Sequence, residues 1–465
     1  MRVLILEDDE GTAKALLERL QEEIEDVLCH LCECAAAARS AIGAMVFDAA
    51  IIDLRVPSEV GAGDASVDNG IAFETHLREV QPGALRVFYT ASDLEMVKEE
   101  LRIGRSEDFF ACGDRFCLVD HVKKDGVSSL NACVAEIVLH SKRLASLDEV
   151  ELAGEHDFDD DARRALALAV RHTEGHSGRV VAKTGKSLSA TATVESLNRN
   201  GDVVAHAFCK AGPPAEIERE IEGHKRARLT LAPTSFPPLI QEIDVGVGVH
   251  RALLFAKAPS TMSFYDLVDD DREKAAGVVD QLVDVFEPWT QLAKLETNTV
   301  GGLLHPVLIQ PDFPGEKYGP QIDQLSLGRI ADIRLDGKSH CQHGDLHGSN
   351  LFVVDTKPFL IDFAHTRDQF GPVDQVSLEM SAIFHEASPS YGTAPELSWA
   401  SFILDGSYDL VANACRRWAT AAGHETMEYV AAMLAYALWI LKHEDELASI
   451  CFGIAGAAVD YLATG

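Results

Sequence analysis

The sequence has few basic residues relative to acidic ones. Its 465 residues contain 41 Lys and Arg against 74 Asp and Glu, which gives a formal net charge of -33. Binding to duplex nucleic acid needs Lys and Arg to replace phosphate counterions, so this balance argues against nucleic acid as a direct partner. No basic helix-turn-helix segment is found either, and direct control of transcription therefore ranks last among the functions considered.

The sequence also lacks any segment typical of secretion or membrane insertion. Residues 1–6 lead directly into acidic residues, without the longer apolar region and cleavage site of a secretory signal. The most apolar later stretch, residues 429–441, is too short to span a bilayer and is followed by charged residues. We therefore expect a cytoplasmic protein that does not enter a membrane.

A regular cysteine framework is missing as well. The ten cysteines are scattered, which in a chain of this size fits reduced thiols packed as small hydrophobic residues. One cluster contains Cys29, His30, Cys32 and Cys34, but no second pair of ligands follows it. Structural zinc sites use paired ligands, so zinc is not expected here.

What the chain does contain is the length and apolar content of several folded domains. Up to about residue 140, short apolar runs at residues 3–6, 49–52, 85–89 and 116–119 alternate with amphipathic helical stretches. This alternation predicts a doubly wound parallel sheet with helices on both faces. Residues 141–178 are more charged and predict a helical connector.

The rest of the chain changes from strand-like to helical patterns. Residues 179–258 predict a small strand-rich lobe with one acidic helix at 215–228, and residues 259–465 predict a larger helical lobe. A bilobal kinase fold has this arrangement. The predicted fold class is therefore α/β: a doubly wound parallel-sheet domain at residues 1–140, followed by a bilobal, protein-kinase-like α+β domain.

Polar residues follow four of the predicted strands in the first domain. Glu7 and Asp8 follow the first strand, Asp53 follows the second apolar run, Thr90 follows the third, and Lys123 and Lys124 follow a fourth strand-like segment. In a doubly wound domain ligands bind outside the carboxyl ends of the strands. Carboxylates gathered there suit Mg²⁺, and a metal-held Asp is a competent nucleophile for phosphoryl transfer.

These residues resemble the response-regulator receiver family over about the first 140 positions. The resemblance implies that Glu7, Asp8 and Asp53 bind Mg²⁺ and that Asp53 accepts a phosphoryl group from a sensor histidine kinase. It matches Thr90 and Lys124 to the switch hydroxyl and the paired lysine, although Lys123 stays open as an alternative. Residues 58–69 lengthen the loop after Asp53. A degenerate receiver kept as a dimerising module is the competing interpretation, and homodimerisation through the receiver is left open.

The most specific pattern is the loop at residues 343–350, His-Gly-Asp-Leu-His-Gly-Ser-Asn, followed by a strand and Asp362. Transfer of phosphate from ATP needs a carboxylate to orient the acceptor and ligands for the metal on the phosphates. Asp345, Asn350 and Asp362 supply these groups at the spacing of kinase catalytic loops. We therefore predict that the domain uses ATP and Mg²⁺.

The loop is similar to that of the aminoglycoside phosphotransferase and choline kinase-like group. Its continuation resembles the ternary-complex-associated phosphotransferase-like domains. The resemblance implies Asp345 as catalytic base and Asn350 and Asp362 as Mg²⁺ ligands, with His343 holding the loop. Asp374 and Glu379 are expected to be structural.

In the small lobe we expect a lysine and a helix glutamate to hold the nucleotide phosphates, as in kinases. Lys210 is the chosen lysine, with Glu220 as its partner and Glu216 as the alternative. Ser187 and Ser189 lie in a segment that could cover phosphates. Residues 253–258 predict the hinge.

Together these patterns predict a two-component-type signalling protein with an ATP-dependent phosphotransferase of unknown acceptor, small molecule or protein, regulated through Asp53. The alternative is a nucleotide-binding pseudokinase scaffold that couples the state of the receiver to a partner protein.

Overall fold

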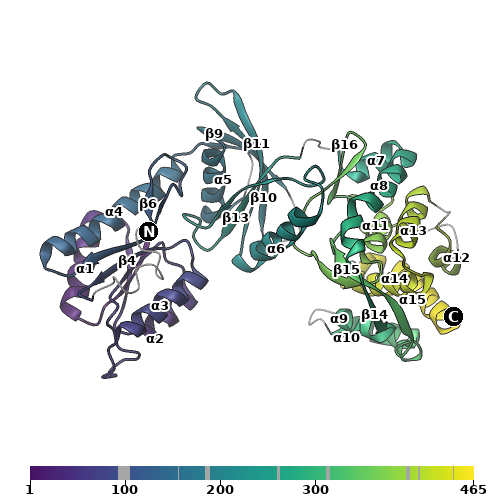
Figure 1. The fold of residues 1–465 in the computed structure, drawn as a ribbon, viewed down its shortest axis with the longest axis horizontal. Helices are drawn as coiled ribbons and strands as arrows, with labels where there is room; N and C mark the ends of the chain where they lie inside the picture. Colours follow the sequence, from purple (N-terminus) through teal and green to yellow (C-terminus); the bar gives the residue numbers. More distant parts are fainter. Residues whose placement is uncertain are drawn as a thin grey trace. The chain divides into compact units, whose positions relative to one another are not determined.

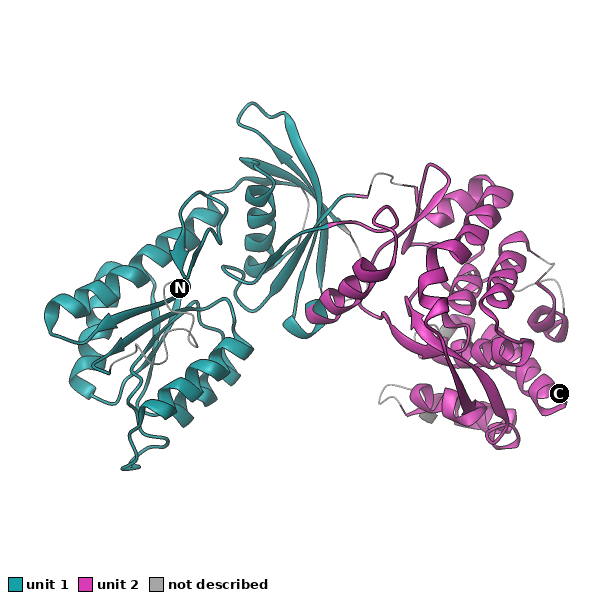
Figure 2. Cartoon of the chain, viewed as in Figure 1, with its two compact units in different colours: residues 1–217, 239–257 teal, residues 218–238, 258–465 magenta. Residues whose placement is uncertain are grey.

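The computed structural model describes residues 1–92, 105–154, 157–183, 189–258, 262–309, 315–393, 398–406, 409–442 and 445–464. The chain forms two compact units (Figure 2). Unit 1 contains residues 1–217 and 239–257, and unit 2 contains residues 218–238 and 258–465. The chain passes between the units after residues 217, 238 and 257, so neither unit is one continuous segment.

Unit 1 begins with a five-stranded parallel sheet in the order β2-β1-β3-β4-β7 (Figure 1). Its strands are β1 (Arg2–Leu6), β2 (Leu28–Cys32), β3 (Ala49–Ile52), β4 (Leu85–Thr90) and β7 (Val119–Lys123). Its helices are α1 (Glu10–Glu23), α2 (Ala35–Ala44), α3 (Val67–Val80) and α4 (Val127–Asp148). This is the predicted doubly wound sheet, with its topological switch at β1 and β3.

Both faces of this sheet are covered, which explains why β3 and β4 are buried along their whole length. On one face, α2 and α3 contribute Ala38, Phe73 and Leu77 to the core. On the other, α1 and α4 contribute Leu16 and Ile137.

Two details of this domain differ from the prediction. Strand β2 was not predicted, because it is an edge strand whose Leu28 and Leu31 are exposed, so no buried apolar run marks it. The run at residues 116–119 was expected to be one strand. Instead β6 (Phe116–Cys117) pairs with β5 (Ser106–Glu107) in a hairpin, and β7 supplies the fifth parallel strand.

A second sheet of unit 1 has the order β12-β13-β11-β10-β9-β8. Its strands are β8 (Leu152–Ala153), β9 (Ser177–Lys183), β10 (Ala190–Leu197), β11 (Val203–Gly212), β12 (Leu239–Ile243) and β13 (Arg251–Ala256), and all pairs except β8 with β9 are antiparallel. Helix α5 (Asp160–His172) packs on this sheet. Leu144 and Leu147, from the end of α4, belong to the same core. Helix α4 therefore packs in the core of the first domain and also in the core of the second sheet.

Unit 2 is mainly helical. Helix α6 (Pro214–Thr230) starts in unit 1 and continues into unit 2, where it is followed by α7 (Phe264–Asp270), α8 (Arg272–Gln291), α9 (Val300–Leu308), α10 (Gly315–Leu325), α11 (Val373–Phe384), α12 (Trp399–Leu404), α13 (Leu410–Ala422), α14 (Thr426–Ile440) and α15 (Ala448–Thr464). Strands β14 (Lys294–Thr299), β15 (Arg334–Gln342) and β18 (Arg367–Phe370) form an antiparallel sheet, and β16 (Leu351–Val354) pairs with β17 (Lys357–Leu360).

The apolar stretch at residues 429–441 is explained by this arrangement. It coincides with α14, which is buried in the main core of unit 2 together with α15. Among the described residues, no helix combines the length and apolar character needed to cross a membrane. The predicted α/β fold class is confirmed: a doubly wound parallel sheet precedes an antiparallel sheet and a mainly helical region.

Candidate functional site

Three carboxylates lie together at the carboxyl edge of the parallel sheet. Glu7 follows β1, Asp8 is next to it, and Asp53 follows β3. One ligand oxygen from each lies within 4.8 Å of the others. Glu7 and Asp53 are buried, whereas Asp8 is exposed. This set of hard oxygen donors on an accessible edge fits a magnesium ion.

Lys124 lies between two of these carboxylates. Its Nζ forms an ion pair with Asp53 and lies 2.6 Å from Glu7 Oε2. Burial alone would lower the pKa of Lys124, but the hydrogen bonds to Asp53 and Glu7 outweigh it and raise the pKa. Burial raises the pKa of Glu7, and the charge of Asp53 raises it further, against the opposing effect of Lys124. The neighbouring Lys123 ends β7 and is exposed, so Lys124 is the lysine that contacts Asp53.

Thr90 completes this edge. It ends β4 and is fully buried, and its carbonyl accepts a hydrogen bond from Lys124 N at 2.9 Å. Its Oγ1 accepts from Ser92 N at 3.2 Å, which leaves the hydroxyl proton free to donate. The five residues selected from the sequence, Glu7, Asp8, Asp53, Thr90 and Lys124, are therefore brought to one edge of the sheet.

The lengthened loop after Asp53 is held by polar contacts. Val56 and Ser66 form an antiparallel bridge. Ser58 N donates to Asp64 Oδ1 at 3.0 Å, and Asn69 Nδ2 donates to the Val56 carbonyl at 3.0 Å. Because its two ends are tied together, the loop has a defined course beside Asp53.

In unit 2, the loop at residues 343–350 connects β15 to β16 and is anchored by Asp374. The two carboxylate oxygens of Asp374 accept from the backbone N–H groups of His343 and Gly344, at 2.7 and 2.8 Å. Asp374 lies in the first turn of α11 and is 1 % exposed. Burial raises its pKa, while the histidine charge and the N–H groups act in the other direction. This buried carboxylate fixes the backbone that carries Asp345.

The loop brings Asp345, Asn350 and Asp362 together. Asn350 Nδ2 donates to the Asp345 carbonyl at 3.0 Å, and the Asn350 carbonyl accepts from Ile361 N at 3.0 Å, directly before Asp362. Asp362 has a φ of 63°, a left-handed conformation that Asp tolerates better than most residues. The carboxylate of Asp345 is 37 % exposed and therefore accessible to an acceptor.

His347 lies next to Asp345. Its Nδ1 accepts from Ser349 N at 3.3 Å, so the neutral ring carries its proton on Nε2, which lies 3.8 Å from Asp345 Oδ2. Burial lowers the pKa of His347, and the charges of Asp345 and Asp362 oppose that effect. Its ring lies 4.4 Å from that of His385, which in turn packs against Tyr265.

The segment after β17 is held from two sides. His343 Nε2 lies 2.9 Å from the Ile361 carbonyl, to which it donates, and Phe363 N donates to Glu220 Oε1 at 2.8 Å. Glu220 is 2 % exposed. One function of this helix glutamate is therefore to hold the segment that carries Asp362.

Two of the predicted nucleotide-binding residues, Lys210 and Ser189, lie in unit 1. Lys210 lies in β11, between β10 and β13, and is 6 % exposed. Ser189 Oγ donates to Glu216 Oε2 at 2.7 Å, which ties the alternative glutamate to the start of β10. Ser187 lies outside the described residues. Lys210 and Glu220 belong to different units.

Three contacts could not be assigned from the sequence. They are the hydrogen bonds that the loop backbone donates to Asp374, the hydrogen bond from Phe363 N to Glu220, and the packing of His385 on His347. Another buried carboxylate, Glu379, pairs with Arg416 at 2.8 Å and accepts from the Tyr429 hydroxyl at 2.5 Å. Its contacts are within the helical core and are structural.

Comparisons with known proteins give structural neighbours only. A scan against protein-family models finds no match, and no curated protein matches the chain. Among solved structures, amicoumacin kinase hAmiN in complex with AMP-PNP, Ca²⁺ and Ami is 12 % identical and aligns over 61 % of this chain and 88 % of its own, with a TM-score of 0.38. A thermostable mutant of aminoglycoside phosphotransferase APH(4)-Ia is 10 % identical over 61 % of this chain and 94 % of its own, also at 0.38. The receiver domain of the Francisella response regulator 1452 is 18 % identical and aligns over 30 % of this chain and 97 % of its own, with a TM-score of 0.23. The fold assignment rests on the strand order of the chain itself.

Proposed function

We propose that the chain is an ATP-dependent phosphotransferase in two-component-type signalling, and that phosphorylation of Asp53 by a sensor histidine kinase regulates it. The observation that carries the catalytic part is the anchoring of the loop at residues 343–350. Asp374 accepts hydrogen bonds from the backbone N–H groups of the two residues before Asp345, and Asn350 Nδ2 donates to the Asp345 carbonyl. A buried, fixed loop with an accessible carboxylate is suited to orienting an acceptor hydroxyl.

The residues present fit a nucleotide and its metal. Asn350 and Asp362 would supply oxygen ligands for Mg²⁺, which would neutralise phosphate charge when bound. Asp345 accepts or orients the proton of the acceptor hydroxyl.

The test compares ATP turnover in Mg²⁺ by the wild type, Asp345→Asn and Asp362→Asn. We expect each variant to lose turnover by on the order of 10²-fold or more, because each removes a charge that acts on the transferred group. Asp355→Asn, at the exposed turn between β16 and β17, is the matched control and keeps the wild-type rate. Equal rates in all four proteins would reject catalysis. Tight ATP binding without turnover would support the pseudokinase scaffold instead.

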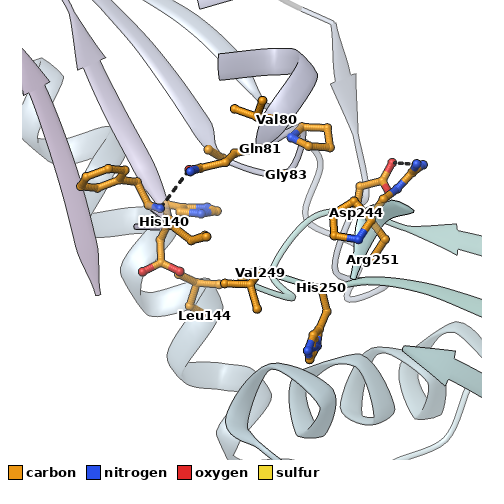
Figure 3. Close-up of a pocket in the computed structure, with 17 residues that line it drawn as sticks. Val80, Gln81, Gly83, His140, Leu144, Asp244, Val249, His250 and Arg251 are labelled. Carbon is orange, nitrogen blue, oxygen red and sulfur yellow. Dashed lines mark hydrogen bonds and ion pairs between the residues drawn. The ribbon is translucent and has the colours of Figure 1, made fainter. Parts of the chain in front are cut away.

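The regulatory part is supported by a junction inside unit 1. A small cavity of about 40 Å³ lies between the amino end of the parallel sheet and the β12–β13 segment, with His140 and Leu144 of α4 in its wall (Figure 3). A Cβ added to Gly83 would lie 1.8 Å from the Asp244 carbonyl, so the two backbones touch there. Asp53 and Thr90 are at the opposite, carboxyl ends of the same strands. Strands and helix α4 thus connect the phosphoacceptor edge to the second sheet.

The regulatory test treats the full chain with acetyl phosphate and Mg²⁺ as a phosphodonor. We expect ATP turnover to change in the wild type and to stay constant in Asp53→Asn. If turnover is the same with and without phosphodonor in both proteins, regulation through Asp53 is rejected, while the catalytic proposal stands.

A further inference from the structure

Two histidines and a glutamate form a buried row in unit 2, apart from the residues assigned above. His340 is in β15, His424 follows the αL cap Gly423 at the end of α13, and Glu428 is in the first turn of α14. Their exposed fractions are 5 %, 6 % and 3 %. His424 Nδ1 lies 2.8 Å from Glu428 Oε2, and the Nε2 atoms of the two rings lie 3.4 Å apart.

The hydrogen-bond partners determine where protons are needed. His340 Nδ1 lies 2.9 Å from the Cys341 carbonyl, which can only accept, so this nitrogen carries a proton and Nε2 of the neutral ring is an acceptor. If Glu428 is ionised and His424 is neutral, His424 Nδ1 also carries its proton. Two Nε2 lone pairs would then face each other in the protein interior.

We propose that this row binds one additional proton, held on His424 Nε2 and donated to His340 Nε2. His424 is then an imidazolium with the Glu428 carboxylate as its counterion, or a neutral ring if its Nδ1 proton moves to Glu428. In both cases every nitrogen has a partner. The number of bound protons is also the same, one more than with an ionised Glu428 and two neutral rings.

The surrounding charges agree with this assignment. Burial lowers the pKa of His340, and the nearby charges of His424 and Lys338 lower it further, so His340 is the acceptor. Lys338 Nζ donates to the Ala422 carbonyl at 2.9 Å, and Asp374, which also faces His340, is occupied by the loop backbone. Glu428 is therefore the carboxylate that balances the proton.

A metal ion is the other cation that two facing imidazoles could bind. Both rings show the second-shell pattern of metal ligands, because each donates its other nitrogen to an oxygen. Within the described ranges, however, the three-ligand group found is Glu7, Asp8 and Asp53, and no third ligand is found beside His340 and His424. Two donors in a buried site favour a proton.

The proton links the loop of the candidate site to the helical core. β15 ends at Gln342, directly after which the loop begins at His343, while His424 follows α13 and Glu428 lies in the first turn of α14. Unfolding at neutral pH would release the proton to water, because a free His has a pKa near 6.5. The row therefore stabilises unit 2 fully below that pKa, and its contribution is lost as pH rises. Each pH unit in that range raises the unfolding equilibrium constant tenfold per proton released.

The direct test is ¹⁵N-histidine NMR of the deuterated full-length protein between pH 6 and 8.5, with His340→Gln and His424→Gln used only to assign signals. We expect a proton on His424 Nε2 and, for His340, a proton on Nδ1 and none on Nε2. Bare Nε2 atoms on both rings throughout this range would overturn the proposal. A change of either ring signal on adding EDTA would overturn it in favour of a metal ion.

A second measurement uses near-isosteric Glu428→Gln, which removes the counterion. Urea unfolding of unit 2 within the full-length protein is compared at pH 6.5 and 8.5. For each pH unit of increase, we expect the folding equilibrium constant of the wild type to fall by up to tenfold more than that of the variant. The substitution His305→Gln, at an exposed position, should behave as the wild type. The same pH dependence in wild type and Glu428→Gln would contradict the proposal.

Discussion

Replacing Asp374 by Asn should separate loop anchoring from packing, because Asn has almost the same shape. Asp374 accepts from His343 N and Gly344 N at 2.7 and 2.8 Å. Asn offers one carbonyl oxygen, so its amide group must face the second N–H. One charge-assisted hydrogen bond is lost, which costs about 1.5–3 kcal/mol. Relief of the buried charge, which already raises the pKa of Asp374, offsets part of this. A net loss of about 2 kcal/mol corresponds to a fall in Tm of roughly 4–8 °C for a unit of this size.

The assay is thermal unfolding of the full-length protein together with ATP turnover in Mg²⁺. Because the loop backbone shifts beside Asp345, we also expect turnover to fall on the order of 10–100-fold. Asp368→Asn in β18 is the matched control, since this side chain is 60 % exposed and its ion pair with Arg226 is worth at most about 1 kcal/mol. An unchanged Tm and rate in Asp374→Asn would refute the view that Asp374 fixes the loop.

Three further predictions concern unit 1. Glu7→Gln should raise the Tm of the metal-free protein at pH 7, because burial raises the pKa of Glu7 and the folded protein therefore loses stability as pH rises and Glu7 ionises. The gain in Tm on adding Mg²⁺ should disappear in this variant. A wild-type response to Mg²⁺ would contradict the prediction. Gly83→Ala should destabilise unit 1 by several kcal/mol in urea unfolding, because the new Cβ meets the Asp244 carbonyl. Gly43→Ala, which adds a Cβ in open space on α2, should stabilise unit 1 by up to ~1 kcal/mol. Equal effects of the two substitutions would reject the close contact. Burial lowers the pKa of His140 from 6.5 to about 4, so as pH falls below 6.5 the unfolded chain binds a proton that the folded chain does not. One pKa unit corresponds to about 1.36 kcal/mol, so the stability of unit 1 should fall by on the order of 3 kcal/mol by pH 4. His140→Leu should show a shallower pH dependence in the same unfolding assay, and an identical pH dependence would refute the assignment.

The sequence could predict the carboxylate edge of the parallel sheet because local pattern and global geometry agree there. In a parallel sheet, residues that directly follow buried strands must meet at one edge, so Glu7, Asp53 and Thr90 were predictable from position alone. The pairing of Lys124 rather than Lys123 depended on the strand's last residue, which a boundary prediction does not resolve.

The supporting contacts could not be predicted in this way. Glu220 binds a backbone N–H 143 residues away, and His340 meets His424 84 residues away. Backbone groups leave no mark in the sequence, and buried polar rows have no periodicity. Edge strand β2 was missed because its sequence, Leu-Cys-His-Leu-Cys, lacks the alternation of buried apolar and exposed polar residues that marks a strand, and both of its leucines are exposed.

The threefold passage of the chain between the units has a consequence for how the protein can be divided. Residues 218–238 supply Ala227, Leu231 and Phe236 to the core around α8, so a fragment starting at residue 258 would lack part of its own interior. A cut after residue 140 would divide α4 and separate Phe110 and Phe116 from Leu144 and Leu147, which belong to the same core. Exchange of the parallel-sheet domain for another by a simple gene fusion at that point would therefore leave exposed apolar surface on both pieces, and a functional chimera should need a junction beyond the end of α4.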